Sequence, residues 1–239
     1  MITNDVPIRT AVTFNKSGAE KIRFIHIPKT AGTTVINVLN GWFRGVNRVN
    51  SWKSLSDLER TALREESIIC GHIPLRYLPI DADNGSKWFT ILRDPREQAI
   101  SCYYEAAKNI AHRNPEMQDL IEEGLERLLL NGKFLQVWTD STRYLSSLPK
   151  EAEMSQALES AKQNLQKFTL VGFYERLASF VGEMSKLLNQ EPPKHLPWEN
   201  KNTYKPGRVA LSPEAMLCLE QIIQYDIELY NYAQQLFND

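Results

Sequence analysis

One loop near the N-terminus combines the residue types that bind a phosphate or sulfate group. An apolar strand, Phe24-Ile25-His26-Ile27, leads into Pro28-Lys29-Thr30-Ala31-Gly32-Thr33-Thr34, where a helix is expected to begin. Backbone N–H groups from Lys29 to Thr34 can converge at the start of that helix, where the helix dipole adds partial positive charge and Lys29 adds a full one. The plainer alternative is a solvated loop lysine, but the Gly-Thr-Thr that follows favours an anion site.

A second anion site is expected where another strand meets a helix. Asp94 is a suitable N-cap and Pro95 suits the first helical position, so Arg93, directly before them, falls at the carboxyl end of the preceding strand. That end is the edge at which open α/β sheets bind ligands. On the helix that follows, Gln98 and Ser101 share a face. Two anion sites suit a ligand with two separated phosphates; the plainer interpretation is that Arg93 and Asp94 form only a structural cap and ion pair.

The elements that must position these residues alternate between strand and helix. Short apolar runs typical of buried parallel strands occupy residues 21–27, 67–71, 87–92 and 168–173. Helical spacing predicts helices over 33–44 and 175–188, and a final helix that starts at Ser212. This alternation predicts an α/β fold of three layers, with a mainly parallel central sheet flanked by helices. Residues 103–166 are mostly helical.

The composition limits the class of protein. At 239 residues the chain suits one α/β domain, residues 1–239. Lys plus Arg number 28 and Asp plus Glu 29, a net charge of −1 that gives no general attraction to nucleic acid or to an anionic membrane. The cysteines lack the CxxC pairing of a zinc site or disulfide framework, and no Cys/His cluster suggests a metal. With no apolar run of membrane-spanning or signal-peptide length, a soluble, cytoplasmic protein is expected.

The motifs resemble those of the sulfotransferases that use 3′-phosphoadenosine 5′-phosphosulfate (PAPS). Pro28–Thr34 looks like their 5′-phosphosulfate loop, and Arg93-Asp94-Pro95 with Ser101 looks like their 3′-phosphate motif. Cys70-Gly71-His72-Ile73-Pro74 is similar to the glycine–histidine segment of the carbohydrate sulfotransferases of the heparan 2-O-sulfotransferase type, family 2. Further similar segments follow downstream: Val171–Leu177 and Tyr225–Tyr230. The resemblance implies a single P-loop-like α/β domain, PAPS as the donor and 3′-phosphoadenosine 5′-phosphate (PAP) as the product.

Sulfuryl transfer needs a cation at the leaving oxygen and a base at the attacking hydroxyl. Lys29 is the expected cation. His72 is the expected base, since it follows a strand end on the same edge if the strands are parallel neighbours, although a structural role is the alternative. His26, inside the first strand, is expected to be structural. No metal is required by this mechanism.

The resemblance also implies how the donor is held. The contacts are Lys29, Thr30, Ala31, Gly32, Thr33 and Thr34 at the 5′-phosphate, Arg93 and Ser101 at the 3′-phosphate, Tyr174 near the adenine, and Lys205 and Arg208 closing over the 3′-phosphate. One position departs from the family, because many relatives have a second arginine where this chain has Gln98. Arg96 lies on the opposite side of the helix and cannot substitute. Either the 3′-phosphate is held less tightly here, or that arginine is structural in the relatives.

The expected function is transfer of a sulfuryl group from PAPS to an acceptor hydroxyl on a carbohydrate or glycolipid, with residues 103–166 shaping the acceptor site. A P-loop-like kinase or NTPase is one alternative, but Lys29 precedes Gly32, whereas in a nucleoside-triphosphate loop the lysine follows the glycine. A non-catalytic nucleotide-binding module is the other alternative, and it would have no reason to keep both Lys29 and His72. The identity of the acceptor and the oligomeric state remain open.

Overall fold

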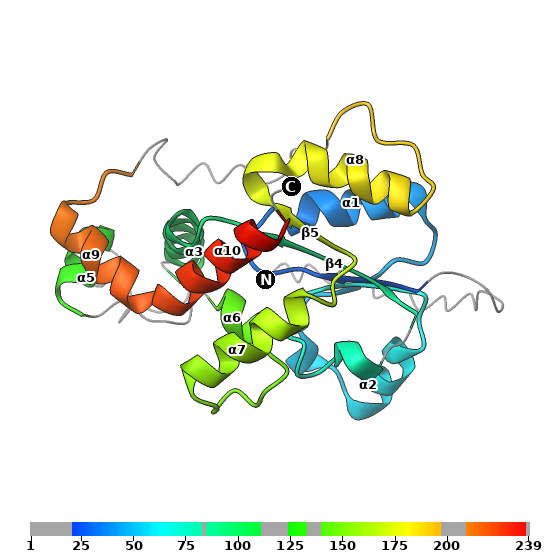
Figure 1. Cartoon of the computed structure of the whole chain (residues 1–239), viewed down its shortest axis with the longest axis horizontal. Helices are drawn as coiled ribbons and strands as arrows, with labels where there is room; N and C mark the ends of the chain where they lie inside the picture. The colour runs from blue at the N-terminus through cyan, green and yellow to red at the C-terminus, as the bar shows by residue number, and fades with distance from the viewer. Residues whose placement is uncertain (1–20, 83–84, 111–123, 133–139, 197–208, 238–239) are drawn as a thin grey trace, which may run out of the picture.

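The computed structural model describes residues 21–82, 85–110, 124–132, 140–196 and 209–237. Within this part of the chain the central sheet has five strands in the order β2-β3-β1-β4-β5. They are β1 (Ile22–Ile25), β2 (Asn47–Val49), β3 (Ile68–Gly71), β4 (Lys87–Leu92) and β5 (Leu170–Phe173). Every neighbouring pair is parallel. Helices lie on both faces of the sheet (Figure 1), so the predicted α/β fold with a mainly parallel sheet is confirmed.

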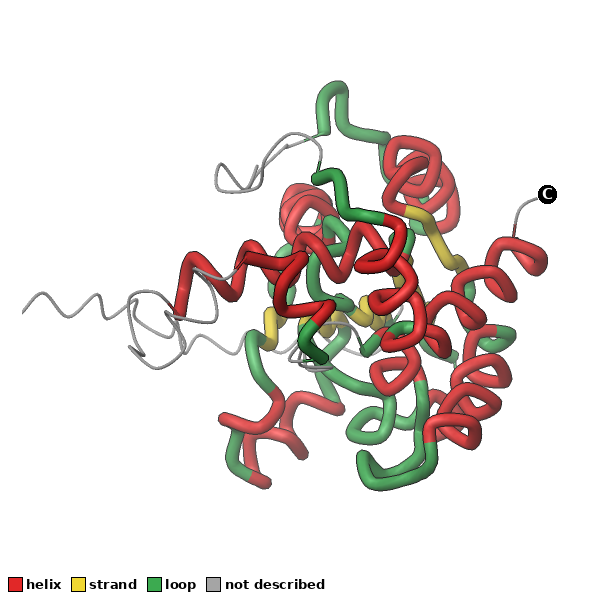
Figure 2. Tube along the Cα trace, turned by 90° about the vertical axis from the view of Figure 1, so that its left-hand side faces the viewer, coloured by secondary structure: helices red, strands yellow, loops and turns green. Residues whose placement is uncertain are grey.

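Two apolar clusters hold the helices against the sheet. On one face, Ile22 and Phe24 of β1 pack with α1 (Gly32–Trp42) and α8 (Leu177–Leu187). On the other face, Ile25 belongs to a cluster with α6 (Ser141–Leu145), α7 (Met154–Leu165) and α10 (Gln224–Phe237). Figure 2, turned by 90°, shows the strands enclosed by these helices. Because β1 is buried on both faces, its near-continuous apolar sequence is typical of a central parallel strand.

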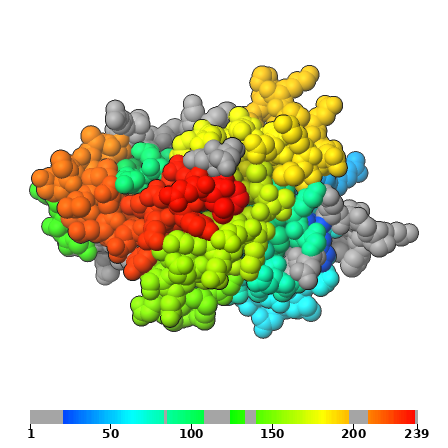
Figure 3. Space-filling view, viewed as in Figure 1, coloured from blue at the N-terminus to red at the C-terminus, as the bar shows by residue number. Residues whose placement is uncertain are grey.

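A third cluster lies beside the sheet. It joins α3 (Pro95–Ile110), α5 (Gly124–Leu130) and α9 (Pro213–Ile222) through small and branched side chains such as Ala99, Leu128 and Leu219. From there α10 crosses the surface between α7 and α8 (Figure 3). The remaining elements are short: η1 (Trp52–Ser54), α2 (Asp57–Arg64), η2 (Ile80–Ala82) and η4 (Tyr174–Arg176). No helix of the described residues is long and apolar enough to cross a membrane.

Two expectations need correction. The short strand β2 was not predicted, because Asn47-Arg48-Val49 has no apolar alternation and is drawn into the sheet by its pairing with β3. The final helix is two helices that are broken at Ile223, although Ser212 caps the first of them as predicted by accepting from the N–H of Ala215. The described part of residues 103–166 contains only helices and their connections, as expected.

Gly71 is the last residue of β3, and its close packing at this end of the sheet can be tested by substitution. Its φ is +141°, and a Cβ at this position would lie 2.0 Å from the carbonyl oxygen of Val49 on β2. Gly71→Ala should therefore lower the free energy of unfolding by more than about 2 kcal/mol. Gly41→Ala is the control, because Gly41 lies in α1 with open space around it and the alanine should stabilise the helix by up to about 1 kcal/mol. Urea denaturation measures both; equal effects would contradict this packing.

Candidate active site

The carboxyl ends of three neighbouring strands bring the sequence motifs together. β1 pairs with β3 on one side and β4 on the other, both in parallel. The loop 26–34 follows β1, His72 follows β3, and Arg93 follows β4. Parallel strands end at the same edge of the sheet. The strands that precede Lys29 and His72 are parallel neighbours, so both residues lie at this edge.

The loop after β1 has the backbone of an anion site. Lys29 and Ala31 have positive φ values of 66° and 69°, a conformation that non-glycine residues adopt rarely and that is concentrated at functional sites. Ala31 is also the N-cap of α1 and gives it no side-chain hydrogen bond. The N–H of Thr34 donates to the carbonyl of Ala31 at 3.0 Å, and the N–H groups before it, on Gly32 and Thr33, have no side-chain cap and can bind an anion. Thr30 serves the loop itself, since its buried hydroxyl donates to the carbonyl of Ile27 at 2.8 Å.

Gly32 makes room for a histidine beneath the loop. A Cβ at Gly32 would lie 1.8 Å from Cδ2 of His26, so only glycine permits this approach. The His26 ring in turn stacks on the His72 ring, with 4.3 Å between centroids and 28° between planes. Burial lowers the pKa of His26 well below 6.5, and the nearby charges of His72, Arg48 and Lys29 lower it further.

His72 is held in the state that a general base requires. Its Nδ1 lies 2.9 Å from the carbonyl oxygen of His26. A carbonyl can only accept, so Nδ1 carries the hydrogen and the lone pair of the neutral ring is on Nε2. Burial lowers the pKa of His72 below 6.5, with a smaller contribution from the charge of Arg48 and an opposing one from the hydrogen bond to His26. The imidazole is therefore neutral near pH 7.

Arg93 joins the loop to the ring of Tyr174. Its Nη1 donates to the carbonyl of Lys29 at 3.1 Å, and its guanidinium carbon lies 4.3 Å from the centre of the Tyr174 ring. Its Nη2 is 3.5 Å from the carboxylate of Glu97. Its Nε is buried and has no hydrogen-bond partner among the described residues. A buried N–H without an acceptor is costly, which fits an arginine that binds an anionic ligand.

Gln98 explains the departure from the expected arginine. Its Nε2 donates to the carbonyl of Pro28 at 2.9 Å, while its Oε1 accepts from the hydroxyl of Ser141 at 3.1 Å. The amide thus joins the loop to α6, a bond that an arginine, which only donates, could not make in this form. The nearby Ser101, one turn along α3, is buried. Gln98 supports the loop through a neutral bridge.

Acidic side chains that the sequence did not single out lie close to these residues. Nζ of Lys29 is 3.3 Å from the carboxylate of Glu105 on α3. Asp140, before α6, has its pKa raised to about 7 by burial and then by the charge of Asp226, against the opposing charge of Arg143. Asp226 accepts from the N–H and the hydroxyl of Thr142, at 2.8 and 2.6 Å. These contacts are made by residues of α3, α6 and α10 that lie far from their partners in the sequence. A local sequence motif therefore could not predict them.

The remaining expected residues divide into two groups. Tyr174, on η4, lies against Arg93 as described above. Lys205 and Arg208 lie outside the described residues. Among the described residues, no group of three or more His, Cys, Asp or Glu side chains could hold a metal ion.

Solved structures of sulfotransferases have the same arrangement of elements. The chain aligns with the crystal structure of mouse sulfotransferase SULT7A1 complexed with PAP over 90% of this chain and 89% of that one, at 14% identity and a TM-score of 0.50. The chain shares the fold of this structure. A sulfotransferase from Alicyclobacillus acidocaldarius aligns over 92% of this chain and 96% of its own, at 11% identity and a TM-score of 0.50. No protein-family model and no curated protein matches the chain.

The buried histidine pair predicts how stability depends on pH. His26 and His72 have folded-state pKa values below 6.5, so the unfolded chain binds more protons once the pH falls below that value. At higher pH, protonation of this pair should therefore give the free energy of unfolding no dependence on pH. As the pH falls through 6.5 toward the folded-state pKa values, the free energy of unfolding should decrease. His72→Asn should make this decrease smaller, as measured by urea denaturation between about pH 5 and 8. An unchanged slope would show that His72 is not held neutral.

Proposed function

We propose that this protein is a PAPS-dependent sulfotransferase. The observation that carries the proposal is the convergence, at one edge of a sulfotransferase fold, of an anion loop with Lys29, an arginine stacked on Tyr174, and a neutral histidine. The fold is shared with a sulfotransferase that was crystallised with PAP. Fold alone does not assign chemistry, so the proposal depends on these side chains.

The residues of this edge fit an anionic donor with two separated phosphates. The positive-φ backbone at Lys29 and Ala31 and the start of α1, which has no side-chain cap, suit the 5′-phosphosulfate at the loop 29–34. The buried, unpartnered Nε of Arg93 suits the 3′-phosphate, together with Ser101. Tyr174 fixes the Arg93 guanidinium by its ring face and is proposed to lie near the adenine. Lys205 and Arg208 are proposed to close over the 3′-phosphate.

The chemistry requires a proton acceptor and a stabilised leaving group. When bound, the donor supplies the sulfuryl group, whose bond to the 5′-phosphate oxygen breaks as the bond to the acceptor oxygen forms. His72 takes the hydroxyl proton on Nε2, because the carbonyl of His26 keeps Nδ1 protonated. Lys29 neutralises the charge that develops on the leaving oxygen. To do so its ammonium exchanges the carboxylate of Glu105 for the donor, or binds both.

The acceptor is proposed to be a hydroxyl of a carbohydrate or glycolipid, because Cys70–Pro74 resembles the segment found in carbohydrate sulfotransferases. The arrangement of α6 beside the loop supports a role for residues 103–166 in shaping the acceptor site.

The single-domain organisation is part of the same proposal. All three cysteines of the chain are unpaired, which supports a reducing, cytoplasmic location.

The donor assignment predicts a ligand preference. PAP should raise the melting temperature more than ATP with magnesium does, because the edge offers two separate anion sites and lacks the triphosphate loop pattern. A ligand at 100 times its Kd adds about 2.7 kcal/mol of stability, which raises the Tm of a chain of this size by several degrees. Differential scanning fluorimetry with matched ligand concentrations measures both. An equal or larger shift with ATP and magnesium would reject PAPS as the donor.

The position of Lys29 predicts a selective loss of turnover. Lys29→Ala should lower kcat about 100-fold or more, since the ammonium acts on charge that exists only in the transition state, and it should change the affinity for PAP much less. Lys186→Ala is the matched control, because this exposed lysine lies on α8 at a distance from the strand ends. Sulfate transfer and isothermal titration with PAP give the two readouts. Unchanged turnover in Lys29→Ala would show that Lys29 does not stabilise the leaving group.

A further inference from the structure

Helix α10 has two polar side chains to which the proposed function gives no role. Asp226 and Tyr230 are four residues apart, so they lie on one face of the helix about one turn from each other. Both are buried, with 4% and 9% of their surface exposed. Each is hydrogen-bonded to a different part of the chain, and each of these parts leads to one of the two proposed phosphate sites.

Asp226 fixes the start of α6. Its Oδ1 accepts from the N–H of Thr142 at 2.8 Å and from the Thr142 hydroxyl at 2.6 Å. The N-cap residue of α6, Asp140, makes no side-chain hydrogen bond to the helix, and a helix of five residues is too short to be stable alone. The carboxylate from α10 therefore supplies the cap that α6 does not provide itself.

The helix α6 in turn holds the anion loop. The hydroxyl of Ser141 donates to Oε1 of Gln98 at 3.1 Å, and Nε2 of Gln98 donates to the carbonyl of Pro28 at 2.9 Å. Pro28 is joined directly to Lys29, whose positive φ is part of the loop conformation. Thr142, Ser141 and Gln98 are each 4% exposed or less, so water does not compete for these bonds. A displacement of α6 would therefore move the backbone of the loop.

Tyr230 supports the other phosphate site through Glu175. Its hydroxyl lies 3.2 Å from Oε2 of Glu175, and its ring packs edge-on against Phe173 with 5.6 Å between centroids. Burial and the charge of Glu175 raise the pKa of the phenol, so the hydroxyl keeps its proton and donates to the carboxylate. The other carboxylate oxygen, Oε1, accepts from the N–H of Asp94 at 3.3 Å. Glu175 thus joins α10 to the segment that follows β4.

This carboxylate lies where Arg93 and Tyr174 must be held together. The ladder between β4 and β5 ends one residue before each of them. The N–H of Asp94 belongs to the peptide group that follows Arg93, and Glu175 follows Tyr174 directly. Beyond the ladder, the bond from Asp94 to Glu175 therefore links the two segments and helps to keep the guanidinium carbon 4.3 Å from the centre of the Tyr174 ring.

We propose that Asp226 and Tyr230 are positioning residues of the donor site, each for one phosphate. Asp226 acts through α6 and Gln98 on the loop at the 5′-phosphate. Tyr230 acts through Glu175 on Arg93 at the 3′-phosphate. The inference rests on the proposed function and makes α10 the element that sets the geometry of both sites.

The test separates the contribution of each phosphate to affinity. Adenosine 5′-phosphate lacks the 3′-phosphate of PAP, and adenosine 3′-phosphate lacks the 5′-phosphate. Isothermal titration gives the affinity of the full-length protein for PAP, and displacement of PAP gives the affinities for the two monophosphates. A loss of stability alone leaves the ratios between these affinities unchanged, because all three ligands bind the same folded protein.

Tyr230→Phe removes one hydroxyl and keeps the ring. It should lower the preference for PAP over adenosine 5′-phosphate about fivefold and leave the preference over adenosine 3′-phosphate unchanged. Asp226→Ala should have the opposite pattern, with a loss of about fivefold or more in the preference over adenosine 3′-phosphate. Asp226→Asn should restore most of it, since the amide oxygen can still accept from Thr142. Ser141→Ala breaks the same connection nearer the loop and serves as the second variant if Asp226→Ala does not fold.

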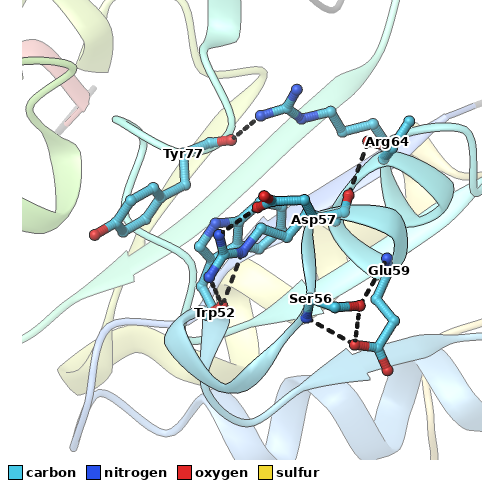
Figure 4. A network of polar contacts seen from close by, with 8 residues as sticks. Trp52, Ser56, Asp57, Glu59, Arg64 and Tyr77 are labelled. Atoms are coloured by element: carbon cyan, nitrogen blue, oxygen red, sulfur yellow. Dashed lines mark hydrogen bonds and ion pairs between the residues drawn. The ribbon is translucent and has the colours of Figure 1, made fainter.

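Glu59→Ala is the matched control for the loss of a buttressing polar contact. The Glu59 carboxylate accepts from the N–H and the hydroxyl of Ser56, at 2.8 and 2.7 Å (Figure 4). It belongs to α2, which lies between β2 and β3 in the chain, and β2 is at the opposite edge of the sheet from β5. None of the donor residues proposed above is on α2. The control should lower the stability and leave both affinity ratios unchanged.

The inference would be overturned if Tyr230→Phe and the variants of the Asp226 connection keep both wild-type ratios, or if either lowers the two ratios equally. A wild type that binds PAP no more tightly than either monophosphate would instead contradict the proposed PAPS-dependent function.

Discussion

Three side chains from three different elements hold the loop that follows β1 by its carbonyl groups. His72 after β3 bonds the carbonyl of His26, and Arg93 after β4 bonds that of Lys29. Gln98 on α3 bonds that of Pro28. These bonds are available because β1 is the centre of a parallel sheet, so that the chain leaves all three strands at the same edge. The loop is thus fixed from both sides in the backbone conformation that an anion site needs. Two of the residues that fix it, His72 and Arg93, are themselves candidates for the chemistry and for donor binding.

This arrangement also sets the electrostatics of the edge. His72 has no carboxylate as its Nδ1 partner; it has a backbone carbonyl and the buried ring of His26. The ring is therefore oriented without the negative charge that would raise its pKa, and it remains unprotonated at neutral pH. Nζ of Lys29 lies 3.3 Å from the carboxylate of Glu105, which compensates the ammonium without a ligand. A chain with almost no net charge can in this way concentrate positive charge where an anionic donor is proposed to bind.

The sequence was sufficient for the parts of the fold and site that depend on local pattern. The buried strands and the turn from Arg93 into α3 are found where apolar runs and capping residues predict them. The sequence does not predict β2 or the break at Ile223, because both depend on tertiary packing. The three residues of β2 are rich in polar side chains and form a strand only beside β3. The apolar stripe of the final helix continues across Ile223, so its spacing does not indicate a bend.

In the candidate site too, some features follow from the local sequence pattern and others only from contacts between distant parts of the chain. Gln98 looked like a missing charge in the sequence, and its bridge from Pro28 to Ser141 appears only once α6 is in place. Asp140 is affected by the charge of Asp226 on α10, and Glu105 lies beside Lys29 in the loop after β1. Residue types and spacing predict where anions bind, but the positions of acidic and bridging groups follow from long-range contacts.

The proposed function requires that the edge formed by β1, β3 and β4 moves a sulfuryl group and does more than bind a nucleotide. The most direct measurement follows the label from [³⁵S]PAPS into a panel of hydroxyl acceptors, with the wild type and with His72→Ala. We expect labelled product with the wild type, and almost none with His72→Ala although PAP binding persists. Label that never enters an acceptor, or transfer that continues at the wild-type rate in His72→Ala, would contradict it.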